Sequence, residues 1–306
     1  MARKGIWTIA GGKGGVGKSF LRSNLSIDLA QRGNSVVVID ADFGGPNIHT
    51  FFGISTSIIS VSDFIKSNQL RLDDILLPTG IANLKLASGA HDVLGMANLN
   101  IIQQNKLIKA INSLDVDYVL VDLGAGTSSY TLDLFLMADV GILVAAPEPT
   151  SVENTYRFIK SAFYRKLKLV IKHQGVRSFL ERITESKLEE APRTPSDLVS
   201  EITDINVQAG EALKYELSNF CPKLILNQVR TPTDVRLGFS MGAASKKHFG
   251  VGLGYVGFVE HDSYVLQSIR QRRPTILQFP DSVAAQCITR IGQNIRQNYH
   301  LVHTNQ

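Results

Sequence analysis

The residues Gly11-Gly-Lys-Gly-Gly-Val-Gly-Lys-Ser19 decide the fold. They lie between an apolar run, Ile6–Ala10, and a run with helical periodicity that begins at Leu21. The segment from Gly12 to Ser19 fits the pattern Gly-x4-Gly-Lys-Ser, in which small residues let backbone N–H groups surround a polyphosphate. The positive end of the following helix adds to that attraction. A strand, a loop and a helix in this order predict a phosphate-binding loop rather than an ordinary glycine-rich turn.

Each residue type in the loop has an expected role. Lys18 is expected to reach the β and γ phosphates, and the Ser19 hydroxyl is expected to ligate Mg²⁺. Lys13 is a second lysine that an ordinary phosphate loop does not need, and it lies too early to duplicate Lys18. A useful role for it is to point toward a second nucleotide or subunit. The predicted nucleotide-binding residues are Gly12, Lys13, Gly14, Gly15, Val16, Gly17, Lys18, Ser19 and Phe20, with Asn227 and Glu260 far along the chain.

The segment Lys13-Gly-Gly-Val-Gly-Lys-Ser19 resembles the deviant Walker A signature of the MinD/ParA ATPases. The motifs are most similar to those of FlhG-like and MinD-like members. The resemblance implies MgATP as the ligand and a homodimer that forms face to face with ATP between the subunits. It also implies that Lys13 crosses to the partner's ATP, that hydrolysis is slow, and that regulatory partner proteins read the dimer.

The rest of the chain favours one α/β domain over residues 1–306, with a mostly parallel, doubly wound sheet of about seven or eight strands. Strand-like and helix-like patterns alternate, and parallel strands need crossovers long enough to hold a helix. Residues 165–218 are longer than such a crossover needs, so we expect a helical insertion there. The predicted strands are Ile6–Ala10, Val36–Ile39, Leu84–Ala87, Tyr118–Val121, Gly141–Ala145, Leu224–Leu226 and Tyr255–Val259.

Carboxylates follow two of these strands, where an ATPase needs them to hold Mg²⁺ and to orient the attacking water. The sequence Asp40-Ala-Asp42-Phe-Gly-Gly-Pro-Asn47 resembles the first switch segment of the family, and Asp122-Leu-Gly-Ala-Gly126 resembles a Walker B aspartate that leads into the second switch. By this resemblance Asp40 lies near the magnesium shell, Asp42 orients the water, and Asp122 binds the metal through water. Lys13, Lys18 and Asp42 are the predicted catalytic residues.

Polar residues at three further strand ends complete the resemblance. Asn227 follows a strand at the edge where open α/β sheets bind ligands, and the resemblance implies that its amide reads adenine. Glu260 follows the next strand, in the segment that lines adenine and ribose. Glu148 lies in a segment that meets the partner subunit in MinD-like members. Asn154 and Phe20 depart from the family pattern, where aspartate and a small hydroxyl residue are commoner.

The composition of the chain bears on the kind of partner and on the cellular compartment that we expect. The formal charge is +5, which permits an acidic partner without requiring one. The N-terminus has no secretory apolar region and the chain has no apolar run long enough to span a bilayer, so we expect a cytoplasmic protein. Residues 297–306 show no amphipathic pattern, so a MinD-type membrane anchor is not expected.

Three alternatives remain open. One is a ParA-like partition ATPase that binds nonspecific DNA, through a basic cluster of Arg270, Arg272 and Arg273 with Lys246 and Lys247. Another is an Mrp-type iron–sulfur carrier, which is disfavoured because Cys221 and Cys287 form no CxxC pair. The last is a scaffold that binds ATP without turning it over.

Overall fold

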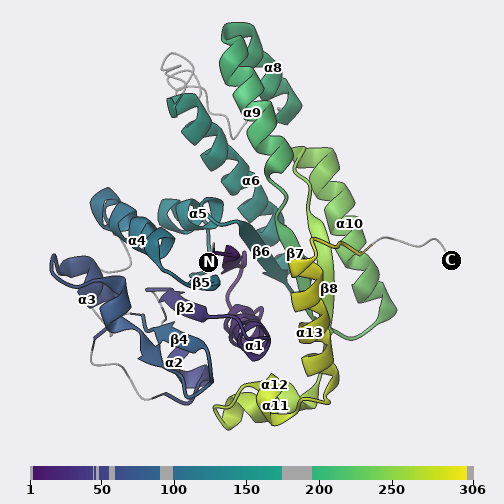
Figure 1. Cartoon of the computed structure of the whole chain (residues 1–306). Coiled ribbons are helices and arrows are strands. Elements are labelled where there is room, and N and C mark those ends of the chain that lie inside the picture. The colour runs from purple at the N-terminus through teal and green to yellow at the C-terminus, as the bar shows by residue number, and fades with distance from the viewer. Residues whose placement is uncertain are drawn as a thin grey trace.

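The computed structural model describes residues 3–43, 45, 48–54, 59–89, 99–173 and 195–301. In this part of the chain, eight strands form one sheet in the order β3-β4-β2-β5-β1-β6-β7-β8 (Figure 1). Asn47 and residues 174–194 of the expected insertion lie outside the described residues.

All seven predicted strands are present, and the predicted fold class is confirmed. They pair in parallel and are β1 (Gly5–Ala10), β2 (Val36–Ala41), β4 (Leu84–Ala87), β5 (Tyr118–Leu123), β6 (Val140–Ala145), β7 (Lys223–Val229) and β8 (Gly254–Glu260). The eighth strand, β3 (Leu77–Pro78), pairs antiparallel with β4 at the sheet edge. It has two residues and contains proline, so it carries no periodic apolar pattern that a sequence could show.

Helices cover both faces of the sheet. Their bounds in chain order are α1 (Lys18–Gln31), α2 (Ile48–Phe51), α3 (Val61–Lys66), the 3₁₀ helix η1 (Leu72–Ile75), α4 (Ile101–Ser113), α5 (Ser129–Leu136), α6 (Pro149–His173), α8 (Pro195–Ile205), α9 (Val207–Asn219), α10 (Pro232–Phe249), α11 (Ser263–Arg270), α12 (Thr275–Gln278) and α13 (Val283–Arg296). Side chains alternate across a strand, so Trp7 of β1 packs in the cluster under α1 and α13, while Ile6 packs in the cluster under α4, α5 and α6.

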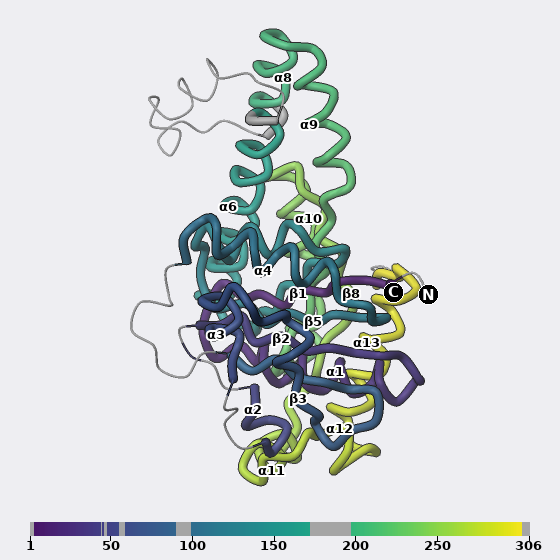
Figure 2. Tube along the Cα trace, turned by 60° about the vertical axis from the view of Figure 1, so that its left-hand side comes forward, coloured from purple at the N-terminus to yellow at the C-terminus, as the bar shows by residue number. Residues whose placement is uncertain are grey.

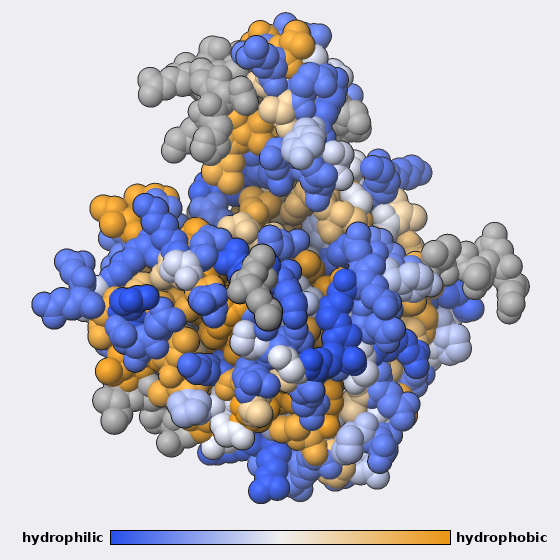
Figure 3. All heavy atoms as spheres, viewed as in Figure 1, coloured by the Kyte–Doolittle hydropathy of each residue, from blue (hydrophilic) through white to orange (hydrophobic). Residues whose placement is uncertain are grey.

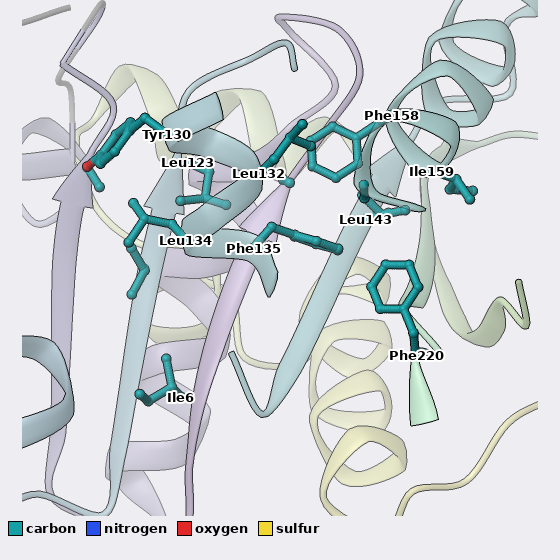
Figure 4. Close-up of a cluster of buried hydrophobic side chains, with 14 of the residues drawn as sticks. Ile6, Leu123, Tyr130, Leu132, Leu134, Phe135, Leu143, Phe158, Ile159 and Phe220 are labelled. Carbon is teal, nitrogen blue, oxygen red and sulfur yellow. The ribbon is translucent and has the colours of Figure 1, made fainter. Parts of the chain in front are cut away.

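Aromatic side chains from distant segments meet in the second of these clusters (Figure 4). Phe135 of α5 packs edge to face against Phe158 of α6, with ring centroids 4.9 Å apart. Phe220, which comes just before β7, lies 6.5 Å from Phe135. Edge-to-face pairs add to the stabilisation from burial. The cluster therefore packs the first half of α6 against α5 and the sheet.

The distal projection, which we define as the end of α6 together with α8 and α9, extends away from the sheet (Figures 1 and 2). It contains the described part of the expected insertion, residues 165–173 and 195–218. Lys166 of α6 forms an ion pair with Glu216 of α9 at 2.9 Å. The helices also share a buried apolar core with Leu198, Ile202 and Leu213. That the segment is an insertion into a single domain stays a prediction.

Candidate nucleotide and magnesium site

The phosphate loop joins β1 to α1 at the middle of the sheet, where β1 lies between β5 and β6. Gly15 and Gly17 adopt left-handed backbone conformations, with φ of 79° and 95°, which glycine adopts at little cost. A Cβ placed on Gly14 or Gly15 would meet no atom within 4 Å, so this side of the loop is open. The loop therefore has the curvature and the free space that a polyphosphate requires.

The back of the loop is closely packed, which explains Gly12 and gives a second reason for Gly17. A Cβ on Gly12 would collide with the backbone of Asn154 in α6, and a Cβ on Gly17 would collide with the amide of Asn227. Asn227 is buried, and its Nδ2 donates a hydrogen bond to the carbonyl oxygen of Val16 at 2.9 Å. The structure thus places Asn227 as a support for the loop, and its predicted contact with adenine stays a prediction.

The two lysines of the loop lie in different environments. Lys18 is buried at the first position of α1. The side chain of Lys13 is 44% exposed, and its Nζ lies 3.2 Å from Glu148 Oε2, which is 56% exposed. Lys13 Nζ is also 3.4 Å from Thr150 Oγ1 in the first turn of α6. Lys13 therefore points away from the loop interior, toward the rim where the sequence predicts a subunit interface.

The predicted metal ligands converge on one face of the sheet. Asp40 of β2 and Asp122 of β5 are register partners on adjacent strands, and both follow alternating residues that pack under α1. From α1, Ser19 Oγ donates a hydrogen bond to Asp122 Oδ2 at 3.3 Å. Asp122 Oδ1 is buried and has no hydrogen-bond partner among the described residues. Carboxylate and hydroxyl oxygens are the ligands that Mg²⁺ prefers, so these residues fit the ion.

Asp40 is wholly buried, and it binds backbone groups on both sides of the chain segment that follows β2. Its carboxylate accepts hydrogen bonds from the backbone N–H of Asp42 at 3.2 Å and of Ile48 at 3.4 Å. Burial raises the pKa of Asp40 to about 7, with Arg22 opposing this rise and Asp122 adding to it. A carboxyl group with this pKa is sensitive to any cation that arrives nearby.

The two switch segments lie next to each other. A Cβ on Gly124 would lie 3.0 Å from Asp42 Oδ1, so a larger residue at 124 would press on that carboxylate. The structure thus brings Asp42 beside the segment that follows Asp122. This is the place from which Asp42 is predicted to orient a water.

Three other predicted residues are placed less directly. The side chains of Phe20 and Val16 are buried in the apolar cluster under α1, so contact with a ligand is left to their backbone groups. Glu260 is exposed at the end of β8. Its role in binding nucleotide stays a prediction.

Sequence reasoning missed Arg22, which forms an ion pair with Asp122. Arg22 lies in a helix whose regularly spaced leucines predict packing against the core, so its side chain was not among the predicted site residues. One feature of the sequence does indicate a role for Arg22. An arginine one turn after the phosphate loop, on the same helix face as Ser19, must point at the edge of the sheet.

The structure also shows the surroundings of the basic cluster and of the two cysteines. Arg270, Arg272 and Arg273 are exposed at and after the end of α11, and Arg272 has φ of 52°. Cys287 is buried and Cys221 is partly exposed.

In the ranges that the structure describes, no group of three His, Cys, Asp or Glu residues is arranged to hold a metal. No helix in those ranges is long and apolar enough to cross a membrane.

Comparison with known proteins identifies the family. The ParA family model, described as the NUBPL iron-transfer P-loop NTPase, matches residues 3–173. The chain belongs to the ParA family of P-loop NTPases. It therefore has a nucleotide-binding ATPase architecture, as the resemblance of its loop implied.

Individual relatives agree with this assignment. The antiactivator FleN of Pseudomonas aeruginosa is 26% identical over 295 residues, which cover 95% of this chain and 85% of FleN. The flagellum site-determining protein YlxH of Helicobacter pylori is 30% identical over 154 residues, and the match spans about half of each protein, 50% and 51%. The structure of MinD with Mg-ADP from Pyrococcus horikoshii aligns with a TM-score of 0.61 at 20% identity, covering 96% of both chains. At that identity the MinD structure supports the fold alone.

Proposed function

We propose that this ParA-family protein is an MgATP-dependent switch that dimerises face to face, with ATP between the subunits, and separates after hydrolysis. The observation that carries the proposal is the different placement of its two loop lysines. Lys18 is buried at the start of α1, where it serves the chain's own phosphates. Lys13 stands half exposed at the rim, held by Glu148 and Thr150, from which it can turn toward a second copy.

The proposed chemistry is electrostatic. Phosphoryl transfer depends mainly on positioning and on stabilising the charge that develops on the phosphate oxygens. Lys18 supplies a positive charge from the same subunit, and Lys13 supplies one from the opposite subunit. Asp42 accepts a hydrogen bond from the attacking water and orients it. Ser19, Asp40 and Asp122 hold Mg²⁺ directly or through water, and the ion neutralises charge on the phosphates.

The proposed cellular role is to control where, or how many, structures are assembled. FleN matches nearly the whole chain, and YlxH and MinD are named for setting the sites of flagella and septa. We propose that the dimer of this chain is recognised by regulatory partner proteins, which also accelerate its slow turnover.

Phosphate release tests the ATPase part of this proposal. The wild type should release phosphate from ATP only with Mg²⁺, and Asp42→Ala should lower the rate by at least about 100-fold, the order of a general acid–base contribution. Nucleotide affinity should stay within a few-fold, because Asp42 acts on water rather than on the phosphates. Equal rates for the two proteins would refute the role of Asp42.

A second candidate function is that of an iron–sulfur carrier. One observation favours it: the family model that matches residues 3–173 is described as an iron-transfer P-loop NTPase. Cys221 and Cys287 are the two cysteines available to it. Anaerobic reconstitution with iron and sulfide, followed by visible absorbance, tests this candidate. A cluster that forms in the wild type and is lost in Cys221→Ser would support it, whereas no cluster absorbance would remove it.

A further inference from the structure

Arg22 is a charged side chain in an unusual place. It lies in the second turn of α1, one turn after Ser19, and it is 0% exposed. Removing a guanidinium from water is costly unless an opposite charge and hydrogen-bond acceptors replace the water. A buried arginine beside a candidate metal site therefore needs an explanation in terms of what it contacts.

Its contact is with the predicted metal ligands. Arg22 Nη1 forms an ion pair with Asp122 Oδ2, the same oxygen that accepts the Ser19 hydrogen bond. Asp40 is the register partner of Asp122 on the adjacent strand, so two carboxyl groups lie side by side beneath the arginine. Like charges this close repel each other unless a cation lies between or above them. Arg22 supplies that cation from the chain itself.

Hydrogen bonding does not explain the residue. Among the described residues, none of the three guanidinium nitrogens of Arg22 has a hydrogen-bond acceptor with suitable geometry. By contrast, Arg165 makes two hydrogen bonds of 2.6 Å to Asp133, and Arg32 makes three to Asp28. Those two arginines make ordinary structural pairs. Arg22 provides charge to the carboxylates rather than a set of directed hydrogen bonds.

We propose that Arg22 is a built-in counter-ion that keeps Mg²⁺ from binding to Asp40 and Asp122 unless nucleotide phosphates arrive with it. By holding Asp122 Oδ2, it also leaves Oδ1 directed at the metal shell, so it is a positioning residue. The proposal rests on the magnesium site of the proposed function. Its physical basis is that a positive charge within several ångströms of a divalent cation lowers the affinity of the carboxylates for that cation.

The test measures thermal stability against Mg²⁺ concentration without nucleotide. The wild type should show no rise in Tm at millimolar Mg²⁺. Arg22→Met should have a lower Tm in EDTA, and Mg²⁺ alone should raise it, with a midpoint at least about tenfold below any response of the wild type. Arg22→Lys, which keeps the charge, should behave like the wild type. Arg32→Met, the matched control at the C-terminal cap of the same helix, should lose stability equally with and without Mg²⁺.

Equal responses of the wild type and Arg22→Met to Mg²⁺ alone would overturn the inference. If Arg22→Met does not fold, the comparison moves to Asp40→Asn with and without Arg22→Met, in which one carboxylate has been removed. The double variant should bind Mg²⁺ more tightly than Asp40→Asn, and equal midpoints would overturn the inference. Binding of fluorescent ADP to the wild type with and without Mg²⁺ separates the two proposals. Absence of MgADP binding refutes the proposed function, whereas normal binding with unchanged metal response in Arg22→Met refutes only the role of Arg22.

Discussion

Two regions of the molecule are built on opposite principles. One is the nucleotide edge, which we define as the carboxyl ends of β1, β2 and β5 with the phosphate loop and the start of α1, and the other is the distal projection. At the nucleotide edge, Asp40, Asp122 and Arg22 are buried together, and glycines hold the backbone in left-handed conformations. The projection has an apolar core and an exposed ion pair between Lys214 and Glu211. Val207 and Tyr215 are exposed on it, and Figure 3 shows apolar surface in this region. Burying charged groups costs free energy even when they are paired, whereas the apolar packing of the projection stabilises the fold without such a cost. The contrast is the one expected if the ligand binds at the nucleotide edge and the projection has only a structural role there.

The largest effect that we expect concerns the pH dependence of the buried carboxyl group. The pKa of Asp40 rises from an ordinary 3.8 to about 7 on folding. Its contribution to stability is therefore fully present below about pH 4 and is lost as the pH rises through 7. The loss is about 4 kcal/mol at most. Asp40→Asn removes this ionisation, so its free energy of unfolding should depend less on pH between 4 and 8.

Urea unfolding of the two proteins, without metal or nucleotide, measures this difference. The free energy of unfolding of the wild type minus that of Asp40→Asn should fall as the pH rises from 4 and become constant above about 8. Parallel stability curves over this range would show that Asp40 is not buried as an ionisable group.

The next largest effect concerns the affinity for ADP, which should respond differently to the loss of Lys18 and of Lys13. Lys18→Ala should weaken ADP binding by about 100-fold, because a charge-assisted contact of this kind is worth roughly 2–3 kcal/mol. Lys13→Ala should change ADP affinity by less than about threefold, because Lys13 points to Glu148 at the rim. Titration with fluorescent ADP checks both. Similar losses in the two variants would place both lysines on the same phosphates.

The smallest effect belongs to the projection. Tyr215 of α9 is 68% exposed, so Tyr215→Ser should change the free energy of unfolding by less than about 0.5 kcal/mol. Affinity for ADP should not change. Chemical denaturation and the same ADP titration provide the measurement. A clear loss of ADP affinity would show that the projection is coupled to the nucleotide edge, and the contrast between the two regions would fail.

Sequence alone could predict the parts of the fold that repeat a local rule. The parallel strands are short apolar runs bounded by turn residues, so each could be predicted from its own local sequence. The strand β3 was not visible, because Leu77 and Pro78 form a strand only through their pairing with β4. The path of residues 195–218 as two helices against α6 likewise depends on tertiary packing that no short pattern contains.

The residues of the candidate site divide in the same way, into those that a local sequence pattern predicts and those whose contacts depend on distant segments. Ser19, Asp40 and Asp122 could be predicted because each follows a strand or loop with a recognisable form. The position of Arg22 one turn after the loop could be read from the sequence, but its contact with Asp122 could not, because that carboxylate comes from a strand distant in sequence. The contact of Asn227 with adenine stays a prediction, and the hydrogen bond of its amide to Val16, which supports the phosphate loop, could not be predicted from its position at a strand end. A strand-end position identifies the edge of the sheet but not the partner of the side chain.

The central claim is that Lys13 acts between two copies of the chain, and light scattering during size-exclusion chromatography tests it most directly. The wild type should be a monomer in ADP and a dimer in a nonhydrolysable ATP analogue with Mg²⁺. Lys13→Ala should bind the analogue but stay monomeric, because no ammonium then reaches the opposite nucleotide. A Lys13→Ala protein that dimerises as the wild type does would contradict the account.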